Sequence, residues 1–331
     1  MSCEKNNCEK FKTMIGGQAL IEGIMMRGPE KDAIVVRKDG QLQIDIRDRK
    51  VRPKNSPLTW PFIRGACNFF DAQVSGVKAL MRSADLSGET EAEAPSKLDL
   101  WLEEKLGNEK FQKLIIGIAV AMGLGLSILL FFLLPMLVSS LLDGLIANTL
   151  MLNLVEGVVR MIIFVCYMLL VSRMNEMRRV FAYHGAEHMT IYCYEAGLPL
   201  TVENVRKQSR KHPRCGTSFL LVVMILSILV FSIASSALLT AVPALSLMRG
   251  SFLYRLIMIL FKLLLLPVVV SVSYEINRWI GRHDNVFTGI MTAPGMWFQN
   301  FTTNEPDDSM IEVGIAALEA VLPQEEGADR W

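Results

Sequence analysis

Two imidazoles and a carboxylate stand close together in one short stretch of the chain. In the sequence His184-Gly185-Ala186-Glu187-His188 the two histidines are four residues apart, and on a helix that spacing places both side chains on one face. Two imidazoles on one face can bind a single divalent metal ion, with zinc as the first expectation. Glu187 lies beside them, where a carboxylate can act as a general base.

Further metal ligands must come from elsewhere in the sequence. His212 and Cys215 offer an imidazole and a thiolate, and Glu275 offers a carboxylate. A catalytic zinc ion keeps an open position beside three protein ligands, whereas a structural zinc ion has four. If His212 and Cys215 both join the two histidines of the motif, the metal is structural. A catalytic metal, a structural metal and a hydrogen-bonded face without metal therefore all remain open.

Four long apolar segments predict membrane-spanning helices. A helix needs about 20 apolar residues to cross the hydrocarbon layer. The chain of 331 residues is 51% hydrophobic and only 20% charged, and it contains four segments of that length, at about 114–142, 149–171, 219–239 and 252–273. The net charge of +1 excludes a nucleic-acid binder driven by bulk charge.

Basic residues orient these spans. The loop 173–218 is rich in Lys and Arg, whereas the turn between the first two spans has none. Because basic loops stay in the cytosol, we expect this loop and both chain ends on the cytosolic side. The basic residues nearest the third span are expected to meet anionic lipid. They are Arg206, Lys207, Arg210, Lys211 and Arg214.

The predicted fold is mainly α, a polytopic membrane protein with four transmembrane helices and a small α+β cytosolic cap containing a β-hairpin. Five regions follow one another along the chain. They are a cytosolic N-terminal region (1–113), spans one and two (114–172), a cytosolic loop (173–218), spans three and four (219–274) and a cytosolic C-terminal region (275–331).

Several smaller elements are expected within the cytosolic regions. The glycine-rich segment that starts at Gly16 predicts tight turns or close backbone approach. Asp39-Gly40 predicts a hairpin between two strands. The remaining predicted elements are an amphipathic helix over 61–84, an acidic linker over 87–95 and a helix opened by Asn304-Glu305-Pro306-Asp307.

Besides Arg255, near the start of the fourth span, three charged residues fall inside the predicted spans. Glu156 and Arg160 are four residues apart and can pair along one helix face, and Lys262 lies at a similar depth in the fourth span. Buried charges in a bilayer are costly and often functional, which favours an ion pair or a polar cavity. A packing clasp with Lys262 extending toward the surface is the alternative.

Several motifs occur together in one order. They are Gly16-Gly17-Gln18-Ala19, Ile21-Glu22-Gly23, Met25-Met26-Arg27, Tyr183-His184-Gly185-Ala186-Glu187-His188, His212-Pro213-Arg214-Cys215-Gly216-Thr217-Ser218-Phe219, Ser273-Tyr274-Glu275 and Thr302-Thr303-Asn304-Glu305-Pro306-Asp307-Asp308. With them the sequence resembles the YqhQ-like family of bacterial polytopic membrane proteins, over about residues 14–320. That family has no established function and is regarded as metal-dependent enzymes, so the resemblance implies a multi-pass protein of the bacterial cytoplasmic membrane.

The leading hypothesis is an integral membrane, metal-dependent hydrolase with its site at the cytosolic membrane face. Glu187 would be its base, and Glu22 and Arg27 could help to position the substrate. A peptidase is the narrower expectation, because inverzincin metalloproteases share the order H-x-x-E-H. The alternative is a non-enzymatic adaptor for membrane-protein biogenesis or quality control, with any metal structural. Either would meet membrane lipids and other membrane proteins, as substrates or clients.

Overall fold

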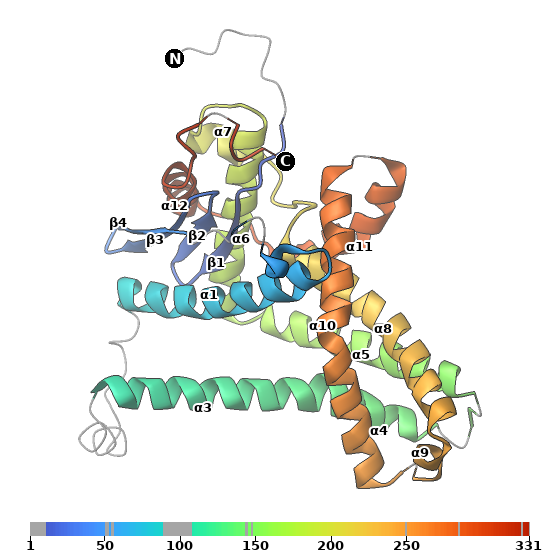
Figure 1. Ribbon diagram of the computed structural model, residues 1–331. Helices are drawn as coiled ribbons and strands as arrows, with labels where there is room; N and C mark the ends of the chain where they lie inside the picture. The colour runs from blue at the N-terminus through green and yellow to red at the C-terminus, as the bar shows by residue number, and fades with distance from the viewer. Residues whose placement is uncertain are drawn as a thin grey trace. The chain divides into compact units, whose positions relative to one another are not determined.

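The glycine-rich segment belongs to a four-stranded antiparallel sheet with the order β1-β2-β3-β4 (Figure 1). Its strands are β1 (Gly16–Leu20), β2 (Gly23–Arg27), β3 (Lys31–Lys38) and β4 (Gln41–Asp48). The predicted hairpin at Asp39-Gly40 is confirmed as β3 and β4. Strands β1 and β2, which pair from Gly16↔Arg27 to Leu20↔Gly23, were not predicted.

This architecture comes from a computed structural model. It describes residues 11–49, 53, 56–88, 108–142, 145–146, 148–248, 250–283, 285–325 and 327–330. Most of the predicted acidic linker, from residue 89 onward, lies outside the described residues.

The other described elements are helical. In chain order they are η1 (Pro57–Thr59), α1 (Ile63–Ser87), α3 (Asn108–Ile128), the π-helical turn η3 (Leu129–Leu133), α4 (Leu134–Ser140), α5 (Thr149–Val171), α6 (Asn175–Glu195), α7 (Val202–Arg206), α8 (Gly216–Ala241), α9 (Pro243–Leu247), α10 (Phe252–Arg282), α11 (Val286–Thr302) and α12 (Asp308–Glu319). Helix α12 is the predicted C-terminal helix, and the side chain of Asp307 caps it by accepting from the amide of Met310. Such a cap satisfies an amide that the first helical turn leaves free.

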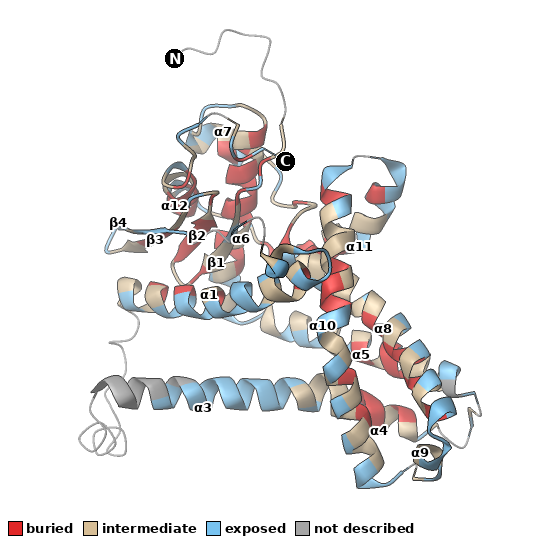
Figure 2. Cartoon of the chain, viewed as in Figure 1, coloured by how far each residue is buried: buried red, intermediate tan, exposed pale blue. Residues whose placement is uncertain are grey.

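Both faces of the sheet are covered at β2 and β3, whose buried apolar residues alternate between the two faces, whereas β4 is exposed. On one face Ile24, Met26 and Val35 pack with buried residues of α6 and α12. On the other face Leu20, Ile34 and Val36 pack with Ala79 of α1. Figure 2 shows how much of α6 is buried in this arrangement. The sheet is therefore a rigid support for α6.

The chain divides into two compact units. The first contains residues 1–89, 168–223 and 270–331, and the second contains residues 90–167 and 224–269. The sheet, α1, α6, α11 and α12 thus belong to one unit, although they come from three separate regions of the sequence.

Four helical segments are long and apolar enough to cross a membrane. They are Gly117–Ser140, Leu150–Val171, Gly216–Ala241 and Phe252–Arg282. The third begins earlier than predicted, directly after Cys215, and the fourth continues past its predicted end. Glu275 therefore lies within α10 rather than beyond it.

In the second unit, the three ionisable residues of the apolar helices lie together. Glu156 accepts from Arg160 at 2.7 Å and also from Lys262, and all three side chains are buried. Lys262 is only 2% exposed, so the expected alternative of a lysine extending toward the surface is wrong.

The carbonyl that Pro135 leaves free in the helix helps to hold this cluster. A proline has no N–H for the carbonyl four residues before it, which here is that of Phe131. Arg160 donates to this carbonyl through Nε at 2.7 Å, and its guanidinium lies over the rings of Phe132 and Phe231. The buried cation thus has hydrogen-bond and aromatic partners in addition to Glu156.

Candidate metal centre

Helix α6 carries the predicted H-x-x-E-H motif. The motif lies on a helix, as two imidazoles on one face at this spacing require, and the helix ends before Gly197, whose φ of 66° is the left-handed conformation that glycine adopts at a helix end. Glu187 and His188 are buried, at 5% and 1% exposure. The motif therefore faces the interior of the first unit rather than solvent.

Gly185 is required by a close approach to α6. A Cβ atom at this position would overlap the carbonyl oxygen of Asn304. Asn304 itself donates to the carbonyls of Phe181, at 2.8 Å from its amide, and Arg178, at 3.0 Å from its side chain. The segment after α11 thus packs directly on α6, and only glycine leaves room for it.

Both motif histidines are fixed by backbone carbonyls. His184 donates through Nδ1 to the carbonyl of Thr302 at 2.7 Å, and His188 donates through Nδ1 to the carbonyl of Arg210 at 2.7 Å. A carbonyl can only accept, so each Nδ1 carries the proton and each Nε2 can offer its lone pair. Metal-binding histidines are commonly oriented in this way.

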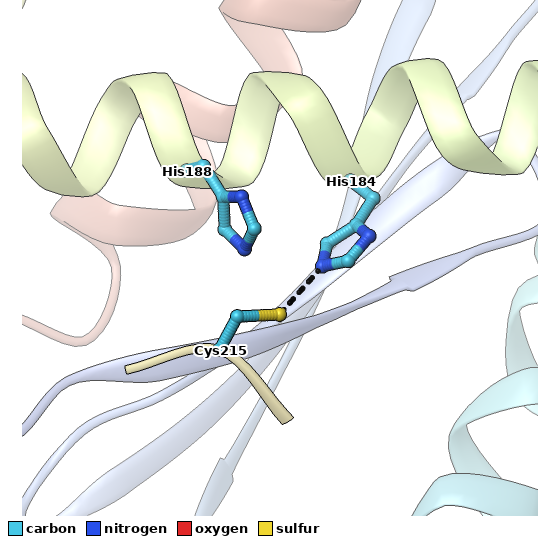
Figure 3. Close-up of side chains that lie close together, drawn as sticks. All are labelled: His184, His188 and Cys215. Carbon is cyan, nitrogen blue, oxygen red and sulfur yellow. Dashed lines mark hydrogen bonds between the residues drawn. The ribbon is translucent and has the colours of Figure 1, made fainter. Parts of the chain in front are cut away.

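The two Nε2 atoms converge on the thiol of Cys215. His184 Nε2 lies 3.1 Å from Cys215 Sγ, and the ligand atoms of the two histidines and this cysteine all lie within 4.8 Å of one another. Figure 3 shows both imidazoles projecting from α6 toward Cys215. His188 Nε2 is buried without a hydrogen-bond partner, and buried polar atoms are rarely left unpaired.

A side chain of α11 positions the turn that carries Cys215. Gln299 accepts from the amide of His212 and donates to its carbonyl, both at 2.8 Å. The amide of Cys215 donates to the same carbonyl at 3.3 Å. Gln299 is fully buried, so this double hydrogen bond fixes the thiol relative to α6.

Glu187 lies against β1. A Cβ atom at Gly17 would lie 2.9 Å from its carboxyl carbon. Its oxygen Oε2 is buried without a partner. The glycine of the N-terminal motif therefore allows the carboxylate to approach the sheet and leaves one oxygen unengaged.

Burial and neighbouring charges alter the pKa values at this cluster. Burial opposes a charged imidazole, but the Cys215 thiolate raises the pKa of His184 to about 9. Burial also opposes the thiolate, yet His184 and His188 hold the pKa of Cys215 well below its usual range. Burial raises the pKa of Glu187, and a raised pKa is the direction that suits a carboxylate acting as a general base.

The structure does not add His212 to the cluster, although its ring lies 5.6 Å from that of His188. Its Nδ1 accepts from the amide of Arg214 at 3.4 Å, and its Nε2 lies 3.6 Å from Glu195. Arg214 pairs with the same glutamate. His212 is thus held by structural partners, and His184, His188 and Cys215 are the group of metal-binding geometry within the described residues.

Three further candidates have other partners. Glu275 binds Arg64 of α1 through both oxygens, at 2.5 and 2.7 Å. Glu22 accepts from Arg179 at 2.5 Å and fastens the β1–β2 turn to α6. Arg27 pairs with Asp32 at 3.2 Å. The structure therefore does not bring Glu275, Glu22 or Arg27 to the cluster.

A cavity of about 510 Å³ opens onto the cluster. His184, Glu187, His188 and Cys215 line it together with residues 16–19 of β1. Leu220, near the start of the apolar helix α8, lines it too. Its volume falls in the range typical of ligand pockets.

Comparison with known proteins identifies the family of this chain. The family described as "Protein of unknown function (DUF1385)" matches residues 60–324. The uncharacterized protein YqhQ of Bacillus subtilis (strain 168) is 31% identical over 323 residues, which cover 95% of this chain and 93% of that protein. The chain belongs to the YqhQ-like family. No solved structure matches it significantly.

The sequence motifs that indicated the YqhQ-like family meet around the cluster. Two of them supply the histidines and Cys215, a third supplies Gly17, and a fourth supplies the carbonyl of Thr302. The carbonyls of Thr302 and Arg210, which orient the two histidines, were not predicted, because backbone groups leave no signature in residue type. The sequence indicated only indirectly that other segments approach the motif, through the glycines Gly17 and Gly185.

Proposed function

We propose that this protein is an integral membrane, metal-dependent hydrolase whose site lies at the cytosolic membrane face. The observation that carries the proposal is the convergence of two carbonyl-oriented imidazoles and one thiolate, with His188 Nε2 buried and unpartnered. Two nitrogens and a sulfur are a donor set that suits Zn²⁺. The four apolar helices, one of which begins directly after Cys215, support the membrane location.

The number of ligands favours catalysis over a structural role. The described residues offer three ligands, because His212 is engaged by Glu195 and Arg214. A catalytic zinc site has three protein ligands and a free position, whereas a structural site is closed. A divalent ion bound here would supply a Lewis acid that polarises a substrate carbonyl.

Glu187 would perform the proton transfers. Its carboxylate takes a proton from a water molecule, whose oxygen adds to the carbonyl carbon of the substrate. The carboxylic acid then returns this proton to the leaving group as the scissile bond breaks. The hydroxyl of water stays on the acyl product, so one water molecule is consumed for each bond cleaved.

Metal analysis of the detergent-purified chain tests the first part of this proposal. Wild type is expected to retain about one zinc ion per chain, and the double variant His184→Ala/His188→Ala to retain none. His283→Ala is the matched control, because this exposed histidine lies at the end of α10 and bonds only the carbonyl of Trp279 among the contacts described. Metal that is absent from wild type, or equal in all three proteins, would contradict the proposal and favour the adaptor.

Hydrolysis of fluorescein-labelled casein tests the second part. Glu187→Gln removes the base but none of the three ligands, so metal content should stay while hydrolysis falls by about 10²–10⁴-fold. A variant that keeps full hydrolytic activity would exclude Glu187 as the base.

A further inference from the structure

Strand β1 has one free edge. The sheet order places β1 at its end, with β2 on one side and no strand on the other among the described residues. Exposed edges present unpaired amides and carbonyls that can pair with another strand. The free edge of β1 is thus a template for an extended chain.

The register of the β1–β2 hairpin identifies the groups on this edge. Leu20 and Gly23 flank its two-residue turn as a hydrogen-bonded pair, so the amide and carbonyl of Leu20 face β2. Residues two apart in a strand direct their amides and carbonyls to the same side. Gly17 and Ala19 alternate with Leu20, so their amides and carbonyls face away from β2.

This edge and the metal-binding cluster share one cavity. Gly17 and Ala19 line it together with His184, Glu187 and Cys215. A chain that pairs with the edge would consequently lie beside Glu187. The volume of about 510 Å³ has room for a few extended residues and none for a folded domain.

The two edges of the sheet differ in their protection. Proteins usually blunt a free edge with charged residues or proline. At the opposite edge, β4 carries Asp45, Arg47 and Asp48, whereas β1 reads Gly-Gly-Gln-Ala-Leu and has no charge. Gly17 is exposed, so the unprotected edge is also free of side chains that would hinder an incoming strand.

We infer that the edge of β1 binds the substrate as an extended peptide strand, in contact with Gly17 and Ala19, and that the hydrolase is therefore a peptidase. The inference rests on the proposed function and adds the substrate class. Strand addition reads backbone groups and tolerates many side chains. A lipid substrate would instead use the apolar wall and gain nothing from the amides of β1.

Hydroxamate binding to the full-length, zinc-loaded chain in detergent tests this inference by calorimetry. Acetohydroxamate probes the metal alone, and N-acetyl-tetra-alanine hydroxamate adds a peptide backbone. The peptide should bind about tenfold tighter or better, the gain expected from one or two additional backbone hydrogen bonds.

Methylation of the peptide nitrogens gives a pattern specific to strand pairing. Only alternate amides of a paired strand face its neighbour. N-methylation of the amides that face β1 should abolish the tighter binding of the peptide relative to acetohydroxamate. N-methylation of the amides that face away from β1 should change the affinity by less than about twofold. This test needs no protein variant.

A variant of the strand gives the complementary test. Ala19→Pro removes an amide that faces away from β2, so the ladder between β1 and β2 is kept. The variant should bind acetohydroxamate with the affinity of wild type. It should bind the peptide hydroxamate no more tightly than acetohydroxamate.

The possible failures are distinguishable. If neither hydroxamate binds, the proposed metal centre is wrong and the inference falls with it. If both bind equally, or if methylation has the same effect at every residue, the metal centre stands and strand pairing is excluded. A preference for acyl hydroxamates with long alkyl chains over the peptide would point to a lipid substrate and overturn the inference.

Discussion

At the scale of single residues, the candidate centre depends on how backbone groups hold side chains. The carbonyls of Thr302 and Arg210 leave both Nε2 atoms facing Cys215. Gly17 and Gly185 lack side chains where β1 and the segment after α11 approach the motif. The chemistry is carried by few residues, but their orientation depends on three distant parts of the chain.

Gly17→Ala is predicted to damage both the sheet and the site. Its Cβ would lie 2.8 Å from the carbonyl oxygen of Met25 and 2.9 Å from the carboxyl carbon of Glu187. Such overpacking costs about 1–3 kcal/mol. Thermal unfolding in detergent should show a lower midpoint than wild type.

Gly16→Ala is the matched control for stability. A Cβ at Gly16 meets no atom within 4 Å, so we expect the free energy of unfolding to change by no more than about 0.5 kcal/mol. Equal midpoints for the two variants would show that the approach of Glu187 to Gly17 is not tight.

The affinity for zinc is predicted to rise with pH. Without metal, His184 holds its proton up to a pKa of about 9, because of the Cys215 thiolate. Zinc must displace that proton, so affinity should increase by about tenfold per pH unit below pH 9. Competition with a chelator of known affinity between pH 6 and 8 measures the slope, and a flat profile would contradict the prediction.

At the scale of elements, some helices and strands could be predicted from local sequence patterns and others could not. Helix α6, the β3–β4 hairpin, α12 and the apolar helices were predicted, because periodicity and end signals mark them locally. The β1–β2 hairpin was missed because its turn uses Ile21-Glu22, with Glu22 at a φ of 50°, in place of the usual Asn-Gly. Regular elements with ordinary turn residues were therefore visible in the sequence.

The ligand set shows the limit of this reasoning. The sequence offered His212, Cys215 and Glu275 as equal candidates. Only tertiary contacts separate them, because Arg64 engages Glu275 and Glu195 engages His212. Arg64 is remote from Glu275 in the sequence, and Glu195 belongs to no motif. Neither pairing could therefore be predicted from the sequence.

The buried cluster of α5 and α10 leads to an asymmetric prediction. Glu156→Gln leaves the cations of Arg160 and Lys262 without a counter-charge and should destabilise the chain by about 3–5 kcal/mol. Lys262→Met leaves the ion pair of Glu156 with Arg160, whose charges cancel. It should therefore lower the free energy of unfolding by much less. Denaturant unfolding in detergent compares them, and a larger loss for Lys262→Met would mean that the lysine does more than neutralise Glu156.

At the scale of the whole molecule, the first compact unit is built from three separate chain regions. These three regions fall largely within the predicted N-terminal region, central loop and C-terminal region. The candidate ligands come from the central loop, whereas Gly17, Thr302 and Gln299 come from the other two regions. Metal binding should therefore depend on the assembly of the whole unit.

Metal removal is predicted to destabilise this unit. A ligand that binds only the folded state stabilises it by about 2.7 kcal/mol at a hundred times its dissociation constant. A chelator should therefore lower the thermal midpoint of wild type and leave that of His184→Ala/His188→Ala unchanged. The same shift in both proteins would indicate metal binding elsewhere.

The most direct measurement is X-ray absorption at the zinc edge of the loaded, detergent-purified chain. A centre formed by His184, His188 and Cys215 should show two nitrogen neighbours at about 2.0–2.1 Å, one sulfur at about 2.3 Å and one further light atom from solvent. A shell with no sulfur, or with four protein ligands, would contradict an open centre at this site.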